Sequence, residues 1–112
     1  MYGTIMRATL KAGQQEAFRR FAQDQGSPAE ANGWISSEFA VEDKDSNRIV
    51  GIIRFKDKDS YVKNASAPNT NENYNQMLKF LEGPPEWIDV HYVAFQGEAL
   101  KEYMTAGAMP AS

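Results

Sequence analysis

The chain contains no cysteine, and only one of its 112 residues is histidine. The lack of cysteine excludes disulfide bonds, thiolate nucleophiles and cysteine-based zinc sites. With a single histidine, a transition-metal site would depend on carboxylates, and none of these cluster in the sequence, so we expect no metal. Basic residues are also in the minority, with 12 Lys and Arg against 15 Asp and Glu and a net charge of -3. This balance argues against nucleic acid as a partner.

Long hydrophobic runs are missing as well. No segment approaches the ~18 apolar residues of a membrane span. The first residues, MYGTIMRATLK, lack the cationic region and apolar run of a secretory signal. We therefore expect a cytoplasmic protein with no membrane partner. The composition is ordinary for a globular protein, and the length suits a single core. We expect one domain at 1–97 and a tail at 98–112, helical in part from Glu98 to Met104.

Hydrophobic periodicity predicts strands where apolar residues alternate and helices where they recur at i, i+3 and i+4. The predicted elements, in order, are a strand at 2–10, a helix at 14–25, strands at 34–41 and 48–55, an interrupted helical region at 57–81 and a strand at 87–96. In the strand at 34–41, alternation puts Trp34 on the opposite side from Phe39.

The second helical region is expected to consist of two pieces. Asp57 or Asp59 can cap the first piece. Pro68 is expected to end it, since proline lacks a donor and disfavours helix in the residue before it. The polar residues Asn69–Asn73 are predicted to form a loop, and the apolar spacing at 74–81 predicts the second piece.

The order strand, helix, strand, strand, helix, strand predicts a ferredoxin-like α+β fold. In this arrangement, right-handed crossovers give a four-stranded antiparallel sheet with the helices on one face. The strands at 48–55 and 87–96 are largely apolar on both sides, which calls for cover on the second face too. A bare face would expose several hundred Å² of apolar surface. We therefore expect a homodimer through the sheet faces, forming a dimeric α+β barrel.

Four segments together resemble the antibiotic biosynthesis monooxygenase family of dimeric α+β barrels. The segments are KAGQQEAFRRF after the first strand, ANGW before the second, RIVGIIRFKDKDSYVKNASAP, and the final EWIDVHYVAF. The resemblance covers about residues 2–96. It implies cofactor-independent oxidation of phenolic or quinol-type substrates, as in some members, or haem degradation, as in others.

The haem-degrading branch relies on an Asn in the first strand and on a Trp and a His around the second helix. The first strand here, YGTIMRATL, has no Asn, and the second helical region has neither Trp nor His. The resemblance therefore does not extend to haem degradation. Quinone-forming members use a cluster of Asn, Trp and Tyr type near this helix, to which Tyr61, Asn64 and Tyr74 are loose equivalents.

Six residues are candidates for a site, each with an alternative structural role. His91 is either a general base that removes a phenolic proton or a half-buried histidine at the sheet or dimer seam. Tyr61, Asn64 and Tyr74 either bind substrate in a pocket or simply pack with their polar ends in water. Arg7 and Arg54 are expected on neighbouring strands. They either bind an anionic or phenolate group together or pair with carboxylates such as Glu38.

Both tryptophans begin strands. We expect Trp34 and Trp87 to pack at the rim or the dimer contact rather than to stack on substrate. Two functions follow from these residues: a cofactor-independent monooxygenase acting on a small aromatic, phenolic or quinol-type substrate, and a non-catalytic dimeric barrel that binds a small hydrophobic ligand. An open cavity that reaches His91, Arg7 or Tyr74 favours the enzyme, and a filled space favours the non-catalytic barrel.

Overall fold

The computed structural model describes residues 1–24, 33–94 and 96–97. Its elements, in order, are β1 (Tyr2–Thr9), α1 (Gln15–Asp24), β2 (Trp34–Val41), β3 (Arg48–Phe55), α2 (Lys58–Ala65), α3 (Pro68–Leu78) and β4 (Glu86–His91). The predicted order of strands and helices is confirmed. The helix expected at Glu98–Met104 lies outside the described residues.

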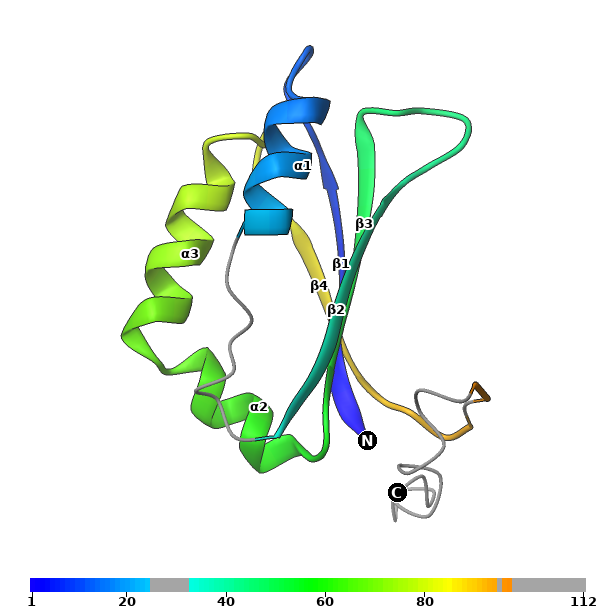
Figure 1. Cartoon of the computed structure of the whole chain (residues 1–112), viewed down its shortest axis with the longest axis vertical. Coiled ribbons are helices and arrows are strands. Elements are labelled where there is room, and N and C mark those ends of the chain that lie inside the picture. The colour runs from blue at the N-terminus through cyan, green and yellow to red at the C-terminus, as the bar shows by residue number, and fades with distance from the viewer. Residues whose placement is uncertain (25–32, 95, 98–112) are drawn as a thin grey trace.

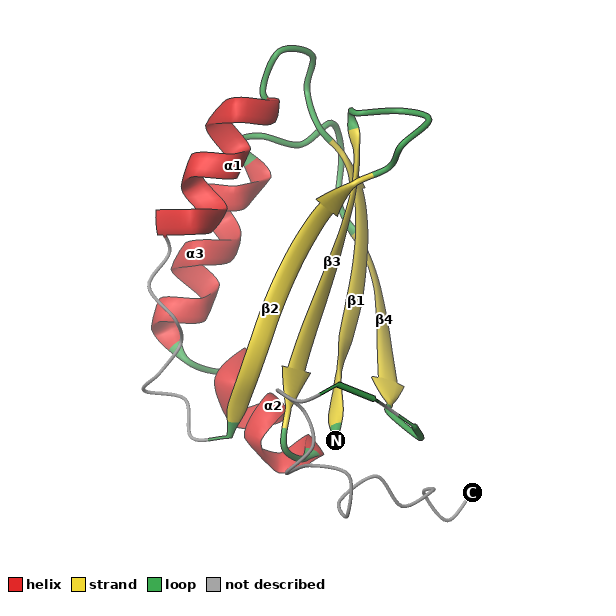
Figure 2. Ribbon diagram, turned by 45° about the vertical axis from the view of Figure 1, so that its right-hand side comes forward, coloured by secondary structure: helices red, strands yellow, loops and turns green. Residues whose placement is uncertain are grey.

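The strands form a four-stranded antiparallel sheet in the order β2-β3-β1-β4. β1 and β3 are central, and β2 and β4 are the edges. The three helices lie on one side of the sheet (Figures 1 and 2). The predicted ferredoxin-like α+β fold is confirmed. Pairing of two copies through the sheet faces stays a prediction.

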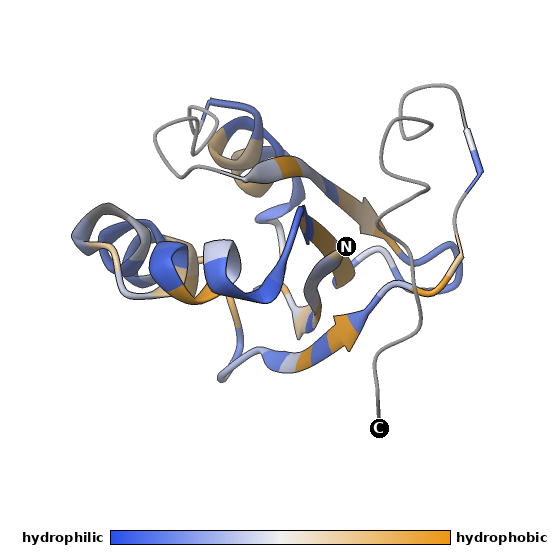
Figure 3. Ribbon diagram, turned by 90° about the horizontal axis from the view of Figure 1, so that it is seen from below, coloured by the Kyte–Doolittle hydropathy of each residue, from blue (hydrophilic) through white to orange (hydrophobic). Residues whose placement is uncertain are grey.

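The core lies between the sheet and helices α1 and α3. Every second residue of β1 points into it, and Met6 is fully buried. Phe18 of α1 and Met77 of α3 meet these strand residues from the helical side. Apolar and polar positions alternate along the strands (Figure 3). The pattern that predicted the strands is therefore also the pattern that forms the core.

The boundary between α2 and α3 differs from the prediction. Asp57 caps α2 as expected, because its Oδ1 accepts a hydrogen bond from the Ser60 amide at 2.8 Å. Pro68, however, is the first residue of α3, and the predicted loop Asn69–Asn73 is helical. Proline suits this position because its missing N–H would have no partner in the first turn, and its φ already fits a helix. Ala67 before it is extended, as a residue preceding proline prefers.

Strand β2 contains an irregularity that sequence periodicity could not show. Trp34 pairs with Phe55, and Ser36 already pairs with Arg54, so the register shifts at Ile35. This shift brings Trp34 to the same face as Phe39, and the prediction that they lie on opposite sides is wrong. An extra residue in one strand changes the parity of every residue before it.

Two glycines allow close packing around this part of β2. Gly33 precedes the strand with φ +95, a conformation that suits glycine, and a Cβ there would lie 2.3 Å from Ser60 Oγ. Gly51 of β3 pairs with Phe39, and a Cβ on it would lie 2.7 Å from the Phe39 ring. The Phe39 ring therefore lies directly on the glycine backbone.

Strand β4 ends at His91, earlier than the predicted Gln96. Beyond the end of β4, one more backbone hydrogen bond joins it to the start of β1: the Tyr92 amide donates to the Met1 carbonyl at 2.9 Å. Within the described residues, no helix has the length and apolar character needed to cross a membrane.

Candidate functional site

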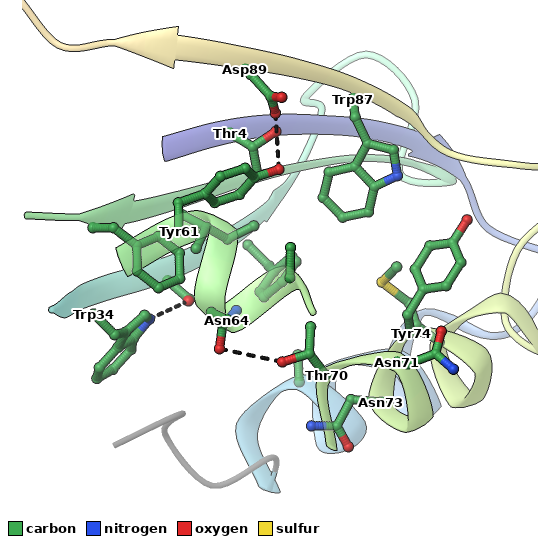
Figure 4. Close-up of a pocket in the computed structure, with 17 residues that line it drawn as sticks. Thr4, Trp34, Tyr61, Asn64, Thr70, Asn71, Asn73, Tyr74, Trp87 and Asp89 are labelled. Carbon is green, nitrogen blue, oxygen red and sulfur yellow. Dashed lines mark hydrogen bonds between the residues drawn. The ribbon is translucent and has the colours of Figure 1, made fainter. Parts of the chain in front are cut away.

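A pocket of about 750 Å³ lies between the sheet and the three helices (Figure 4). This volume is within the usual range for small-molecule sites. Its lining combines aromatic, amide and hydroxyl side chains with aliphatic ones. The residues that line it are Thr4, Ala22, Trp34, Ser37, Phe39, Ile53, Phe55, Tyr61, Asn64, Ala65, Thr70, Asn71, Asn73, Tyr74, Met77, Trp87 and Asp89.

Helical spacing explains how α2 and α3 contribute to the pocket. From α2 come Tyr61, Asn64 and Ala65, at i, i+3 and i+4. From α3 come Thr70, Asn73, Tyr74 and Met77, at i, i+3, i+4 and i+7, with Asn71 beside them. Residues at these spacings share one face of a helix, so each helix points a single stripe at the sheet.

The sheet supplies alternate residues of its strands. Trp87 and Asp89 of β4 are two residues apart and face the helices together. The Trp87 ring lies 6.1 Å from the Tyr74 ring, so β4 and α3 meet through aromatic side chains. Trp87 is 41% exposed, and Asp89 is also exposed. The pocket is therefore accessible to solvent along β4.

Among the described residues that line the pocket, Asp89 and Tyr61 are the ionisable pair that a hydrogen bond joins. The Tyr61 hydroxyl donates to Asp89 Oδ1 at 3.0 Å (Figure 4). The Tyr61 ring is held by Phe55 at 5.6 Å and by Tyr2 at 5.3 Å. Burial, together with the hydrogen bond to Asp89, raises the pKa of Tyr61 to about 12. Tyr61 is therefore a neutral donor at physiological pH.

The polar wall opposite Asp89 consists of side chains that both donate and accept hydrogen bonds. Thr70 donates to Asn64 Oδ1 at 3.3 Å, which links α2 to α3. In β2, Trp34 Nε1 donates to Ser37 Oγ at 2.9 Å. The Asn64 amide nitrogen makes no hydrogen bond to any residue that the structure describes. It remains available to a carbonyl or hydroxyl oxygen of a ligand.

Three of the six residues singled out in the sequence meet in this pocket. Tyr61, Asn64 and Tyr74 all line it, and Figure 4 shows them pointing into the space between helices and sheet. The sequence placed them near a break in the helical region, and the break at Ala67 separates α2 from α3. Their role in binding stays a prediction.

The two arginines lie elsewhere. Arg54 pairs with Gly3 and Arg7 with Val50 in the ladder between β1 and β3, four residues apart along the strands. Neither lines the pocket. Arg54 forms an ion pair with Glu38, and Arg7 lies 3.9 Å from Glu42. The structure therefore does not bring them together, and the ion-pair alternative describes their contacts.

His91 faces the same side of β4 as Asp89 but lies two residues further along the strand. Its ring contacts the Tyr2 ring edge-on, with centroids 4.9 Å apart. Tyr2 in turn packs against Tyr61. His91 is exposed and is not among the residues that line the pocket. Tyr2 lies between it and the site.

Several residues that line the pocket were not predicted from the sequence. Both tryptophans line the pocket, although packing at a rim or dimer contact was expected for them. Asp89 was not singled out, yet a carboxylate that alternates with Trp87 and His91 on a largely apolar strand is a signal for a buried or site-facing acid. Asn71 and Asn73 were assigned to a loop, and only the helical start at Pro68 shows which way they face.

Among the residues that the structure describes, no group of three or more His, Asp and Glu side chains is arranged to hold a metal ion. The hydrogen-bond partner of Asp89 in the described residues is the Tyr61 hydroxyl, and His91 follows it on the same face of β4.

No family model matches the sequence, and no curated protein matches it. Solved structures do match. A candidate antibiotic biosynthesis monooxygenase from Chloroflexus aurantiacus is 20% identical, with a TM-score of 0.70 over 86% of this chain and 96% of that one. A variant of SnoaB, a cofactor-independent oxygenase from Streptomyces nogalater, is 18% identical, with a TM-score of 0.68 over 87% and 95%.

A third match is Rv0793 from Mycobacterium tuberculosis, 16% identical, with a TM-score of 0.66 over 88% of this chain and 97% of that one. These matches confirm the resemblance to the antibiotic biosynthesis monooxygenases at the level of fold. At such identities, shared architecture does not determine the reaction or the substrate.

Proposed function

We propose that this protein is a cofactor-independent monooxygenase that acts on a small phenolic or quinol-type substrate in the pocket between sheet and helices. The observation that carries the proposal is the lining of that pocket. Aromatic rings of Trp34, Tyr61, Tyr74 and Trp87 surround it, with amide and hydroxyl groups between them. Rings of this kind pack against the faces of a flat ligand, and the polar groups fix its oxygen atoms. The oxygenase named among the proteins of the same fold supports the proposal.

The reaction that suits such a site uses the substrate itself as the reductant. Loss of the hydroxyl proton gives an electron-rich phenolate, whose para carbon forms a bond to dioxygen. Cleavage of the O–O bond leaves one oxygen on the ring as a carbonyl and releases the other as water. A phenol and O₂ thus give a quinone and H₂O, and the ring supplies all four electrons. The protein contributes orientation and exclusion of water.

The proton needs an acceptor close to the bound ring. Asp89 is in the pocket, and its Oδ2 accepts no hydrogen bond from any described residue. His91, the acceptor proposed from the sequence, lies behind Tyr2. Comparison of Asp89→Asn with His91→Ala decides between the two. The pocket geometry favours Asp89, so we expect Asp89→Asn to slow turnover by about 10²-fold or more, as loss of a general base does, and His91→Ala to leave it nearly unchanged.

We also propose that two copies pair through their sheet faces. The side of the sheet away from the helices carries Ile5, Val50, Ile52, Ile88 and Val90, and Ile88 is 44% exposed. In a two-fold dimer the same surface of both subunits forms the interface, and this apolar face can pack against its own copy in that way. Light scattering is expected to give twice the mass of one chain. Ile52→Glu should give the monomer mass, and a monomeric wild type would contradict the pairing.

The oxygenase is tested by oxygen consumption with one-, two- and three-ring phenols. Ala65→Trp fills the pocket from α2, and Ala17→Trp places the same side chain on α1, on an exposed position away from the pocket. We expect wild type and Ala17→Trp to consume oxygen and form quinone at equal rates, and Ala65→Trp to lose the activity. If the protein binds ligands but consumes oxygen with none of the phenols, the alternative of a non-catalytic ligand-binding barrel is favoured.

A further inference from the structure

Among the described residues that line the pocket, Asp89 is the only acidic side chain, and Lys, Arg and His are all absent. Lys58, whose Nζ lies 5.9 Å from the centre of the Tyr2 ring, is outside the lining. A site for a carboxylate or phosphate would present a guanidinium, an ammonium or a group of free backbone amides. The described lining shows no guanidinium or ammonium, which argues against an anionic ligand.

The carboxylate also has an oxygen that can accept a second hydrogen bond. Tyr61 donates to Oδ1, and the rings of Phe55 and Tyr2 hold Tyr61 in place. Oδ2 of the same carboxylate has no partner among the described residues and belongs to a side chain that lines the pocket. An ionised carboxylate only accepts hydrogen bonds, so its partner must be a donor. The hydroxyl of an uncharged phenol is such a donor.

We propose that Asp89 selects the ligand by charge: it accepts a hydrogen bond from a hydroxyl of an uncharged aromatic ring and repels aromatic acids. Tyr61 is the positioning residue that holds the carboxylate. The inference rests on the proposed function, because it assumes that the pocket binds aromatic ligands, and it narrows the substrate class to neutral polyphenols and quinols. The amide groups of Asn64 on α2 and of the asparagines of α3 that line the pocket then contact the remaining oxygen atoms of the ligand.

A purely structural role for Asp89 makes a different prediction. If the carboxylate served only to hold Tyr61, replacing it would change stability but not the preference between a neutral and an anionic ligand. Selection by charge requires the preference itself to change. The two roles are therefore separated by a ratio of affinities rather than by a single affinity.

The test uses two ligands of the same shape, a hydroxynaphthamide and the corresponding hydroxynaphthoate, which differ in charge. Their dissociation constants are measured by isothermal titration calorimetry at neutral pH. We expect the wild type to bind the amide roughly tenfold more tightly than the acid, a ratio in keeping with one partly screened like-charge contact. Asp89→Asn should bring the ratio close to one.

Asp43→Asn is the matched control. It removes the same charge from the exposed turn between β2 and β3, and the ratio should stay at its wild-type value. Tyr61→Phe keeps the charge but releases the carboxylate, so amide binding should weaken while the acid stays disfavoured. In the wild type, the ratio should fall as salt is added, because salt screens repulsion at an exposed carboxylate. This last measurement tests the proposal even if Asp89→Asn does not fold.

The outcomes separate this inference from the proposed function. An unchanged ratio in Asp89→Asn, or a wild type that prefers the acid, would overturn selection by Asp89 while leaving the oxygenase in place. Selective binding without oxygen consumption would overturn the oxygenase and keep the selectivity. If neither ligand binds while phenols are still oxidised, selection by Asp89 is overturned and the oxygenase stands; if neither ligand binds and no phenol is oxidised, both proposals are overturned.

Discussion

Replacement of Tyr61 by Phe tests the central contact of the pocket through its effect on stability at different pH. The Tyr61 hydroxyl donates to Asp89 at 3.0 Å and also interacts with the Thr4 hydroxyl. Phenylalanine keeps the ring contacts with Phe55 and Tyr2 and removes the hydroxyl alone. At neutral pH, loss of a bond to a charged acceptor at a partly exposed site should lower the free energy of unfolding by about 1 kcal/mol.

The same residue makes this difference depend on pH. The pKa of Tyr61 rises from 10.0 to about 12 in the folded protein. A pKa raised by folding stabilises the protein fully below the unfolded value, and this contribution declines as the pH rises from 10 and is gone above 12. Two pH units correspond to about 2.7 kcal/mol, which solvent screening of this partly exposed group reduces to about 1 kcal/mol.

Urea unfolding followed by circular dichroism from pH 8 to pH 12 measures the effect. Wild type should exceed Tyr61→Phe in stability at pH 8, and the two should converge toward pH 12, since only the wild type must ionise this hydroxyl. Tyr74→Phe serves as the control, because the Tyr74 hydroxyl makes no hydrogen bond to a described residue. A stability difference between wild type and Tyr61→Phe that stays constant from pH 8 to pH 12 would contradict the coupling between folding and ionisation of Tyr61.

Three further substitutions test the packing that positions the pocket. Gly51→Ala should push the Phe39 ring out of contact and lower the free energy of unfolding by about 1–3 kcal/mol, measured by urea unfolding. Asp57→Ala removes the cap on the Ser60 amide and should cost about 1 kcal/mol at neutral pH. Because that hydrogen bond lowers the pKa of Asp57, the cost should shrink as the pH falls and Asp57 becomes protonated in wild type. Phe18→Ala opens a cavity in the core and should cost about 3–5 kcal/mol, seen as a large fall in Tm.

Each of these three has an outcome that contradicts it. Unchanged stability of Gly51→Ala would show that the Phe39 ring moves without cost. If the loss of stability in Asp57→Ala is the same at neutral and acid pH, the capping hydrogen bond does not depend on the charge of the Asp57 carboxylate. A fall in stability below 1 kcal/mol for Phe18→Ala would mean that the core refills the space.

The strand and helix pattern was predictable because it depends on short-range periodicity. Alternation in β1 and the spacing of Phe18 in α1 identify the buried face of each element without any knowledge of its neighbours. Tyr61, Asn64 and Tyr74 were also predictable as a group, since Pro68 interrupts the helical pattern beside them. The break beside Pro68 was predicted, but the start of α3 at Pro68 was not, although proline suits the first position of a helix.

Two features of the pocket needed the tertiary structure. The shift at Ile35 turns Trp34 toward the helices, and periodicity has no means of placing such a shift. Asp89 becomes a pocket residue only because β4 pairs with β1 at the edge of the sheet, where Tyr61 of α2 reaches it across 28 residues of sequence.

The order of the elements, the single layer of helices and the apolar faces could therefore be predicted from local pattern, because these depend on contacts between residues a few positions apart. Which polar side chains meet depends on the folded arrangement of the whole chain. It separated Arg7 from Arg54, placed His91 behind Tyr2 and joined Asp89 to Tyr61. Pairings of this kind depend on strand register and edge position, which are set by the packing of the whole chain.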